Sequence, residues 1–142
     1  MIEDVNETNY NEVLTFLEES KLINKIDPIL VKCASVIKID EKIYGILSYE
    51  LSKTSVDFAI IRYFIFKKTM NRNEVLQLVE YVSKKLKALK LSKLIALASN
   101  KEIFDLLIEA KFEEVKSSLV FVDEINFQNS KMKKVIPLKL DI

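Results

Sequence analysis

The stretch RYFIFKKTMNRNEVL, which runs from Arg62 to Leu76, predicts a strand, a short turn and the opening of a helix. Its first five residues are rich in aromatic and β-branched side chains, which favours a strand. Polar residues follow, and after them apolar residues recur with the 3–4 spacing of a buried helical face. The turn contains no glycine, although a loop that wraps an anion normally uses glycine to bring its N–H groups close. This segment therefore predicts a strand–turn–helix unit, and its turn is unusual for an anion site.

Length and composition predict one domain that spans residues 1–142. Hydrophobic residues make up 49% of the chain, which is enough for a core, and the formal net charge is only +1. Such a balanced charge argues against nucleic acid or an anionic membrane as a partner. The only arginines are Arg62 and Arg72. Because nucleic-acid readers and phosphate clamps favour arginine forks, this also lowers the expectation of either function.

Histidine is absent and Cys33 is the single cysteine. These facts remove the commonest general base and metal ligand, and they exclude an internal disulfide, so we expect no metal site. The N-terminus has neither the basic region nor the apolar run of a signal peptide. No stretch reaches the ~20 apolar residues of a membrane span. We therefore expect a cytoplasmic protein, and richness in Lys, Ile and Asn is typical of an AT-rich bacterial genome.

Periodicity predicts three helices. The first spans roughly 9–20, with capping spacing between Asn9 and Glu12. The third opens at Ser99, which has capping-box spacing with Glu102, and runs to Ala110. Between them, a helix over about 72–90 has an apolar face made of Val75, Leu78, Val79, Val82, Leu86 and Leu89. Residues 21–32, which contain Pro28, are expected to form a short helix or a loop.

Runs of β-branched and aromatic residues predict the strands, and polar turns separate three of them into an antiparallel meander. Asp40 and Glu41 are expected at the first of these turns, and residues 52–55 at the second. Pro137 predicts an edge position or a bulge in the last strand. The expected strands cover 1–6, 34–39, 43–51, 56–66, 94–98, 118–124 and 134–140. The chain thus predicts an α+β fold, with a mixed, mostly antiparallel sheet flanked by helices.

The element order, β-α-(α)-β-β-β-α-β-α-β-β, resembles that of the GNAT family of acyl-CoA N-acyltransferases over essentially the whole chain. Tyr44–Tyr49 is similar to the hydrophobic–Gly–hydrophobic third strand of that family, and Asn100–Val115 to its "Asn…Leu-Tyr…Gly-Phe-Glu-Glu-Val" segment. Arg62–Phe66 is similar to the fourth strand, whose splayed end binds the pantetheine arm. The resemblance therefore implies acetyl-CoA as cofactor, and its implied contacts are the main chain of Phe64, Ile65 and Phe66 together with Asn71, Arg72 and Asn100.

Several positions depart from the family's pattern. The pyrophosphate motif Arg/Gln-x-x-Gly-x-Gly/Ala falls on Asn71, Glu74 and Leu76. Leu107 stands where a tyrosine often serves as general acid toward the CoA thiolate, and Lys111 where a glycine precedes the phenylalanine. A carboxylate ~4 Å from a phosphate costs roughly 1 kcal/mol in water-like surroundings and ~4 kcal/mol at an effective dielectric of 20. We therefore expect Glu74 and Leu76 to weaken acetyl-CoA binding.

Two further observations bear on this turn. Asn71 and Glu74 have N-cap and N3 spacing, so Glu74 is alternatively expected to fold back and accept hydrogen bonds from the helix's own N–H groups. Three basic residues near the turn either compensate the negative charge of Glu74 or are solvated turn charges: Lys67, Lys68 and Arg72.

Catalytic residues are harder to assign. Glu50 and Asp57 flank a hairpin and are candidate bases, while Tyr63 and Tyr49 lie on strands and are candidate proton donors. We take Glu50 and Tyr63 as the candidates for the catalytic site. Each also has a structural interpretation, as a turn carboxylate or as a packed tyrosine.

Two other residues have simpler interpretations. Tyr81 is expected on the long helix in a packing or surface role. Cys33 lacks a histidine partner and is expected to be a small apolar residue.

Three functions remain open at the level of the sequence. In the first, the chain is an acyltransferase that moves an acyl group from acyl-CoA to a small-molecule or peptide amine. Alternatively, it is a catalytically inactive GNAT-fold module for binding or regulation. The third interpretation is an interaction protein that dimerises through the exposed edge of its last strands.

Overall fold

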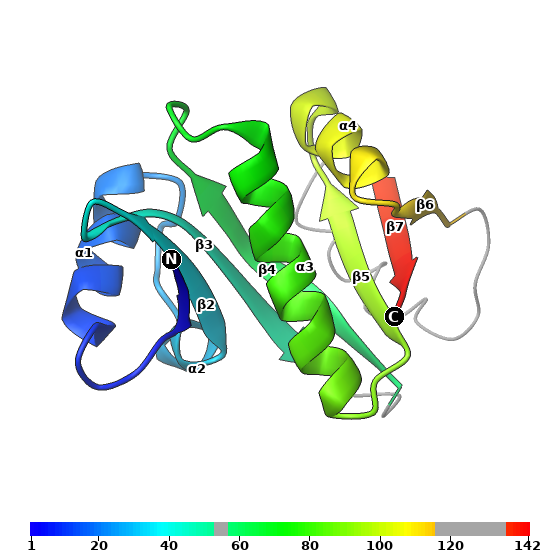
Figure 1. Ribbon diagram of the computed structural model, residues 1–142, viewed down its shortest axis with the longest axis horizontal. Coiled ribbons are helices and arrows are strands. Elements are labelled where there is room, and N and C mark those ends of the chain that lie inside the picture. The colour runs from blue at the N-terminus through cyan, green and yellow to red at the C-terminus, as the bar shows by residue number, and fades with distance from the viewer. Residues whose placement is uncertain (53–56, 116–135) are drawn as a thin grey trace. The chain divides into compact units, whose positions relative to one another are not determined.

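The computed structural model describes residues 1–52, 57–115 and 136–142. The chain forms two compact units. Unit 1 contains Met1–Glu50 and Arg62–Val82, and unit 2 contains Leu51–Ile61 and Ser83–Ile142. The strands follow the order β1-β2-β3-β4-β5-β7-β6 in the sheet (Figure 1).

The elements that begin in unit 1 are β1 (Ile2–Asp4), α1 (Tyr10–Ser20), α2 (Pro28–Lys32), β2 (Ala34–Ile39), β3 (Lys42–Leu51) and α3 (Arg72–Ala88). β4 (Phe58–Phe66) begins in unit 2 and its last five residues belong to unit 1. β1, β2 and β3 pair antiparallel in sequence, with a register shift between Ile37 and Lys38. These bounds confirm the predicted helices and the first four strands to within a few residues.

The core of unit 1 lies where α1 and α2 pack on one face of β2 and β3. Val13 and Leu17 of α1 and Val31 of α2 are fully buried against Val36 and Ile46. Side chains alternate between the two faces of a strand, so Ser35 points away from that cluster. On the opposite face of the sheet, the Ser35 hydroxyl donates to the Asp4 carboxylate at 2.9 Å, and the Tyr81 hydroxyl of α3 donates to the same oxygen at 3.2 Å. β1, β2 and α3 are joined through one carboxylate.

The turn between β2 and β3 confirms the expected tight hairpin. Ile39 pairs with Lys42, which leaves two loop residues. Both have positive φ, 50° at Asp40 and 67° at Glu41. Type I′ hairpin turns require this conformation at both positions, and aspartate is among the non-glycine residues that adopt it more readily.

In unit 2, β5 (Lys93–Ala98) pairs parallel with β4 from Phe58↔Lys93 to Ile60↔Ile95. On its other side it pairs antiparallel with β7 (Ile136–Asp141), from Lys93↔Asp141 to Ala98↔Ile136. α4 (Lys101–Glu109) follows β5, and the two-residue β6 (Glu113–Glu114) pairs with β7. Phe58, Ile60 and Ile95 form a buried cluster with Val115 packed against it.

α3 and α4 each end on a lysine in the left-handed conformation, as α1 does at Lys21. At the end of α3, Lys90 has φ 66° while Leu91 N–H donates to the Leu86 carbonyl and Lys90 N–H to the Lys87 carbonyl. At the end of α4, Lys111 has φ 77° while Phe112 N–H donates to Leu107 and Lys111 N–H to Ile108. These are Schellman motifs, in which glycine is the usual residue at the left-handed position.

The end of α3 also corrects one predicted core residue. Leu89 is 58% exposed, because α3 ends at Ala88 and the Schellman turn directs the chain away. Leu91, one residue past the left-handed Lys90, is the buried one. A hydrophobic contact between the residue after the left-handed position and the last helical turn commonly accompanies this motif.

Two predicted caps are wrong. Asn9 precedes α1, but its side chain makes no cap hydrogen bond there; its Oδ1 accepts from Asn6 N–H at 2.8 Å instead. α4 is capped by Asn100, whose Oδ1 accepts from Ile103 N–H at 2.9 Å, rather than by Ser99.

The end of the chain differs from the prediction. β7 is not an edge strand, because β6 lies outside it, and its register with β5 runs continuously through Leu97↔Pro137. Val115 N–H donates to the Pro137 carbonyl. Since N–H and C=O of one strand residue point the same way, the missing proline donor faces β6 rather than β5.

Other expectations fall beyond the described ranges. The strand expected at 118–124 lies outside the described residues, as do residues 53–55 of the expected second turn. Within the ranges described, none of the helices combines the length and apolar character needed to cross a bilayer.

Candidate functional site

The β4–α3 connection is the centre of the candidate site, and it lies in unit 1. Lys67 N–H donates to the Tyr44 carbonyl at 2.8 Å, which ties the end of β4 to β3. Met70 N–H donates to the Lys67 carbonyl at 3.0 Å and closes a short turn. The Lys67 Nζ lies 4.6 Å from the centroid of the Tyr44 ring, within the range of a cation–π interaction. The turn therefore has a defined conformation without any glycine.

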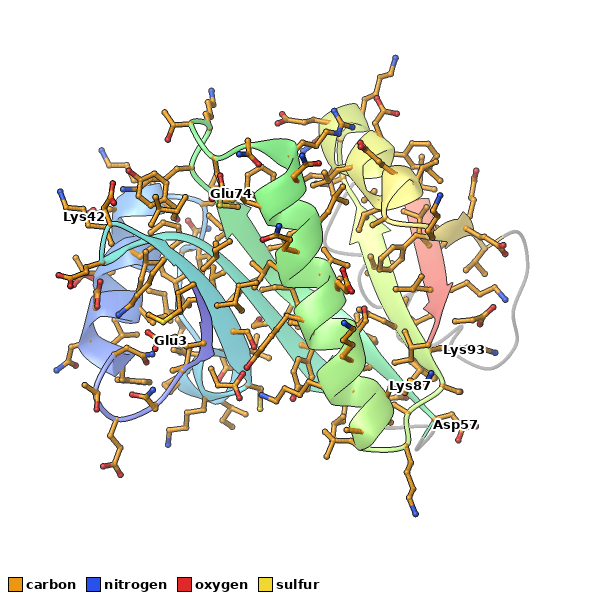
Figure 2. All side chains as sticks on the ribbon, in the orientation of Figure 1. Glu3, Lys42, Asp57, Glu74, Lys87 and Lys93 are labelled. Carbon is orange, nitrogen blue, oxygen red and sulfur yellow. The ribbon has the colours of Figure 1, made fainter. Side chains whose placement is uncertain are left out.

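α3 begins with a reciprocal capping box. Asn71 Oδ1 accepts from Glu74 N–H at 2.9 Å, and Glu74 Oε1 accepts from Asn71 N–H at 3.3 Å. Figure 2 shows Glu74 at the end of α3 that follows this turn. Met70 and Val75, at the two positions that a hydrophobic staple joins, are both buried. The alternative expectation for Glu74, that it folds back on its own helix, is confirmed.

The charge of Glu74 is not neutralised locally. Among residues 1–52, 57–115 and 136–142, no lysine or arginine lies within ion-pair distance of its carboxylate. Lys67 stays over the Tyr44 ring, and Lys68 is exposed. A carboxylate at this point interacts favourably with the helix dipole. At the start of α3, the chain's own carboxylate therefore accepts a hydrogen bond from a main-chain N–H group, that of Asn71.

Gly45 determines how closely the turn approaches β3. A Cβ at this position would lie 3.1 Å from both Ile37 Cγ2 and Met70 Cε, and 3.3 Å from Phe66 Cβ. The only glycine of the chain therefore serves close packing rather than a positive φ. Phe66 in turn contacts Phe64, with ring centroids 5.6 Å apart and planes tilted by 59°.

The candidate base Glu50 forms an ion pair. Arg62 Nε donates to Glu50 Oε2 at 2.7 Å, and the two side chains are 19% and 29% exposed, respectively. A charge-assisted hydrogen bond of this length fixes the position of the Glu50 carboxylate.

The candidate acid Tyr63 joins β4 to the segment between α1 and α2. Its hydroxyl accepts from Asp27 N–H at 3.0 Å, and Asp27 Oδ1 accepts from Ile29 N–H to cap α2. Tyr63 N–H donates to the buried Ser48 hydroxyl at 2.9 Å. The phenol oxygen thus receives one hydrogen bond and keeps its own proton available to donate.

The remaining predicted residues lie apart from this turn in the chain. In unit 2, Asn100 caps α4, Leu107 is buried with 1% of its surface exposed, and Lys111 ends the helix in the left-handed conformation. Asp57 is exposed, and its carbonyl accepts from Ser92 N–H. Cys33 is half-buried, and its carbonyl accepts from Tyr49 N–H.

Sequence reasoning missed three contacts at this site: Tyr44 with Lys67, Tyr63 with Asp27, and Ser48 with Tyr63. The first had a weak signal, since Tyr44 precedes the glycine of a strand expected to pair with β4. The other two had none, because a side chain that bonds a distant main-chain group leaves no periodic pattern.

Comparison with known proteins gives the fold. The sequence matches no protein-family model, and it matches no curated protein. Many solved structures do match its fold. N-acetylglutamate synthase from Neisseria gonorrhoeae, complexed with coenzyme A and N-acetyl-glutamate, superposes with a TM-score of 0.77 at 14% identity, over 99% of this chain and 34% of that one. The chain therefore spans about a third of the length of that synthase.

Two other matches span nearly their full length. Rv2747 from Mycobacterium tuberculosis, in complex with CoA, has a TM-score of 0.77 at 10% identity, over 100% of this chain and 99% of that one. Ribosomal-protein-alanine N-acetyltransferase from Brucella melitensis has a TM-score of 0.72 at 11% identity, over 100% and 99%. The chain has the GNAT acyl-CoA N-acyltransferase fold, as its element order predicted.

Proposed function

We propose that this chain is an N-acyltransferase that moves an acyl group from an acyl-CoA thioester, acetyl-CoA in the first instance, to an amine. The observation that carries the proposal is the similarity of fold, over at least 99% of the chain, to acetyltransferases and to proteins crystallised with CoA. Fold alone is weak evidence for activity, so the proposal depends on the residues of unit 1 as well.

In such a transfer the amine nitrogen bonds to the acyl carbon, the carbon–sulfur bond breaks, the amine loses a proton and the thiolate gains one. We assign the proton donation to Tyr63, whose hydroxyl receives a hydrogen bond from Asp27 N–H and retains its own proton. Leu107 leaves no hydroxyl at the position where the family often has one. Arg62 Nε binds the other candidate, Glu50, and Arg62 is the neighbour of Tyr63 on β4, so the side chains of Glu50 and Tyr63 lie on opposite faces of the sheet. We therefore propose Tyr63 alone as the catalytic side chain, and the amine proton passes to solvent.

The acceptor is proposed only as a class. Among the similar structures are acetyltransferases named for a ribosomal-protein alanine, an aminoglycoside and diaminobutyric acid, all of which are amines. A small-molecule or peptide amine is therefore the acceptor proposed here. We further propose that residues 1–142 act as one cytoplasmic domain and that two copies of the chain form a homodimer.

The test combines binding with turnover. The purified protein is incubated with acetyl-CoA and a panel of amino acids, polyamines, aminoglycosides and peptide N-termini, and free thiol and acetylated product are both measured. Acetyl-CoA at ~100 times its dissociation constant should add about 2.7 kcal/mol to the unfolding free energy. Absence of both product and any rise in melting temperature, at millimolar acetyl-CoA, would overturn the proposal.

Two observations favour a second function, that of a catalytically inactive binding module. The Glu74 carboxylate binds at the start of α3, and Leu107 replaces a hydroxyl. On this alternative, acyl-CoA raises the melting temperature while no amine in the panel yields product.

A further inference from the structure

We propose that Glu74 is an internal competitor for the donor's diphosphate, so that the diphosphate adds little to the affinity of the protein for its donor. This inference rests on the proposed function and concerns the same site. It predicts a donor preference: an acyl-pantetheine thioester without the nucleotide diphosphate loses little affinity relative to acyl-CoA.

The first step of the argument is geometric. The N–H groups that open a helix are the donors an anion would use. Here the Glu74 carboxylate accepts from Asn71 N–H, and the Asn71 amide accepts from Glu74 N–H. A phosphate oxygen that takes up either donor must break one half of this capping box.

The second step is electrostatic. The carboxylate has no cationic partner within ion-pair distance in the part of the chain that the structure describes, so its charge opposes any arriving anion. Lys67, the first basic residue of the turn, lies over the Tyr44 ring. Repulsion between charges ~4 Å apart weakens binding roughly fivefold in water-like surroundings and roughly a thousandfold at an effective dielectric of 20.

Glu74→Gln tests the charge without removing the cap. Glutamine also serves at this position of a capping box, so the acceptor of the Asn71 N–H is kept while the negative charge is lost. The matched control is Glu19→Gln, an exposed glutamate on α1 that makes the same change in net charge. Circular dichroism and melting temperature check that all three proteins are folded.

The measurement is calorimetric titration of each protein with CoA and, separately, with pantetheine. We expect CoA affinity to rise about five- to a thousandfold in Glu74→Gln, with pantetheine affinity unchanged within about threefold. Glu19→Gln should match the parent for both ligands. In the parent, CoA should bind no more than about tenfold more tightly than pantetheine.

The remaining outcomes separate the two proposals. Equal CoA affinity in the parent and in Glu74→Gln overturns the internal competitor and leaves the acyltransferase function standing. Equal gains for CoA and pantetheine also overturn it, because the effect would then be conformational rather than electrostatic. If neither ligand binds any of the folded proteins, this inference and the proposed function both fail.

Discussion

Asn71 and Glu74 each accept the other's main-chain N–H at the start of α3, at 2.9 and 3.3 Å. The pair gives the helix a defined start where the chain has no glycine to shape the turn. It also brings a negative charge to the end of the helix that attracts anions. The same arrangement thus stabilises the start of the helix and, in our proposal, opposes the donor's diphosphate.

Asn71→Ala should lower the unfolding free energy by about 1 kcal/mol, because an N-cap side chain is lost and Glu74 N–H loses its acceptor. Urea denaturation of the purified protein measures the change. Asn73→Ala is the control, since this exposed residue lies two positions after Asn71 in the first turn of α3 and takes no part in the capping box. Equal losses in the two variants would contradict the capping role of Asn71.

Lys111→Gly and Lys90→Gly should each raise the unfolding free energy by about 1 kcal/mol. Both lysines have the positive φ of a Schellman motif, 77° and 66°, where a side chain is strained and glycine is not. The expected rise in melting temperature is roughly 2–5 °C for each. Lys87→Gly, in the last turn of α3 with helical geometry, should instead lose about 1 kcal/mol. A lower unfolding free energy in Lys111→Gly would contradict the proposed backbone strain at Lys111.

The helices and most strands were predictable because burial imposes a period on the sequence. Val75, Leu78, Val79, Val82 and Leu86 are all buried, as their spacing predicts. Leu89 continues the same spacing and is exposed, since the helix ends before it. Periodicity carries no information about where a left-handed residue stops a helix, and lysine at that position gives no signal.

The candidate site was predictable only in part. The spacing of Asn71 and Glu74 matched a known capping pattern, so the fold-back of Glu74 followed from local chemistry. The ion pair of Glu50 with Arg62 and the bond from Asp27 to Tyr63 join residues 12 and 36 positions apart. Such contacts depend on how strands and loops pack, which no local pattern encodes.

Gly45→Ala should destabilise the protein by about 1–3 kcal/mol through overpacking. The added methyl would lie 3.1 Å from Met70 Cε and from Ile37 Cγ2, so both side chains must move. Thermal unfolding measures the loss. A second substitution, Met70→Ala, removes one of the two close neighbours at the cost of a cavity. Non-additivity in the Gly45 and Met70 double-mutant cycle tests whether the two sites contact each other. Strict additivity would count against the clash.

Acid should remove a small part of the stability through Glu3. The hydrogen bond from Lys38 holds the pKa of Glu3 below its usual 4.5. Because the folded pKa is depressed, the stabilisation is present above the unfolded value and is lost as the pH falls through the folded one. Lys38 lies 3.0 Å from Glu3 and 3.3 Å from Glu12. A partly exposed cluster of this kind contributes up to about 1 kcal/mol. Glu3→Gln should therefore make the unfolding free energy depend less on pH between pH 5 and pH 3 at low salt. If the variant shows the same pH dependence as the parent, the Glu3–Lys38 pair contributes nothing to stability.

Tyr63→Phe distinguishes a proton donor from an anchor. The variant loses the oxygen that accepts from Asp27 N–H, so the unfolding free energy should fall by about 1 kcal/mol in either case. Loss of a general acid should in addition lower kcat by roughly 10²- to 10⁴-fold while KM changes little. Tyr10→Phe, a half-buried tyrosine on α1, serves as the control and should keep both constants. A kcat within threefold of the parent, together with the loss of stability, would show that Tyr63 holds the α1–α2 segment in place and that the proton comes from another donor.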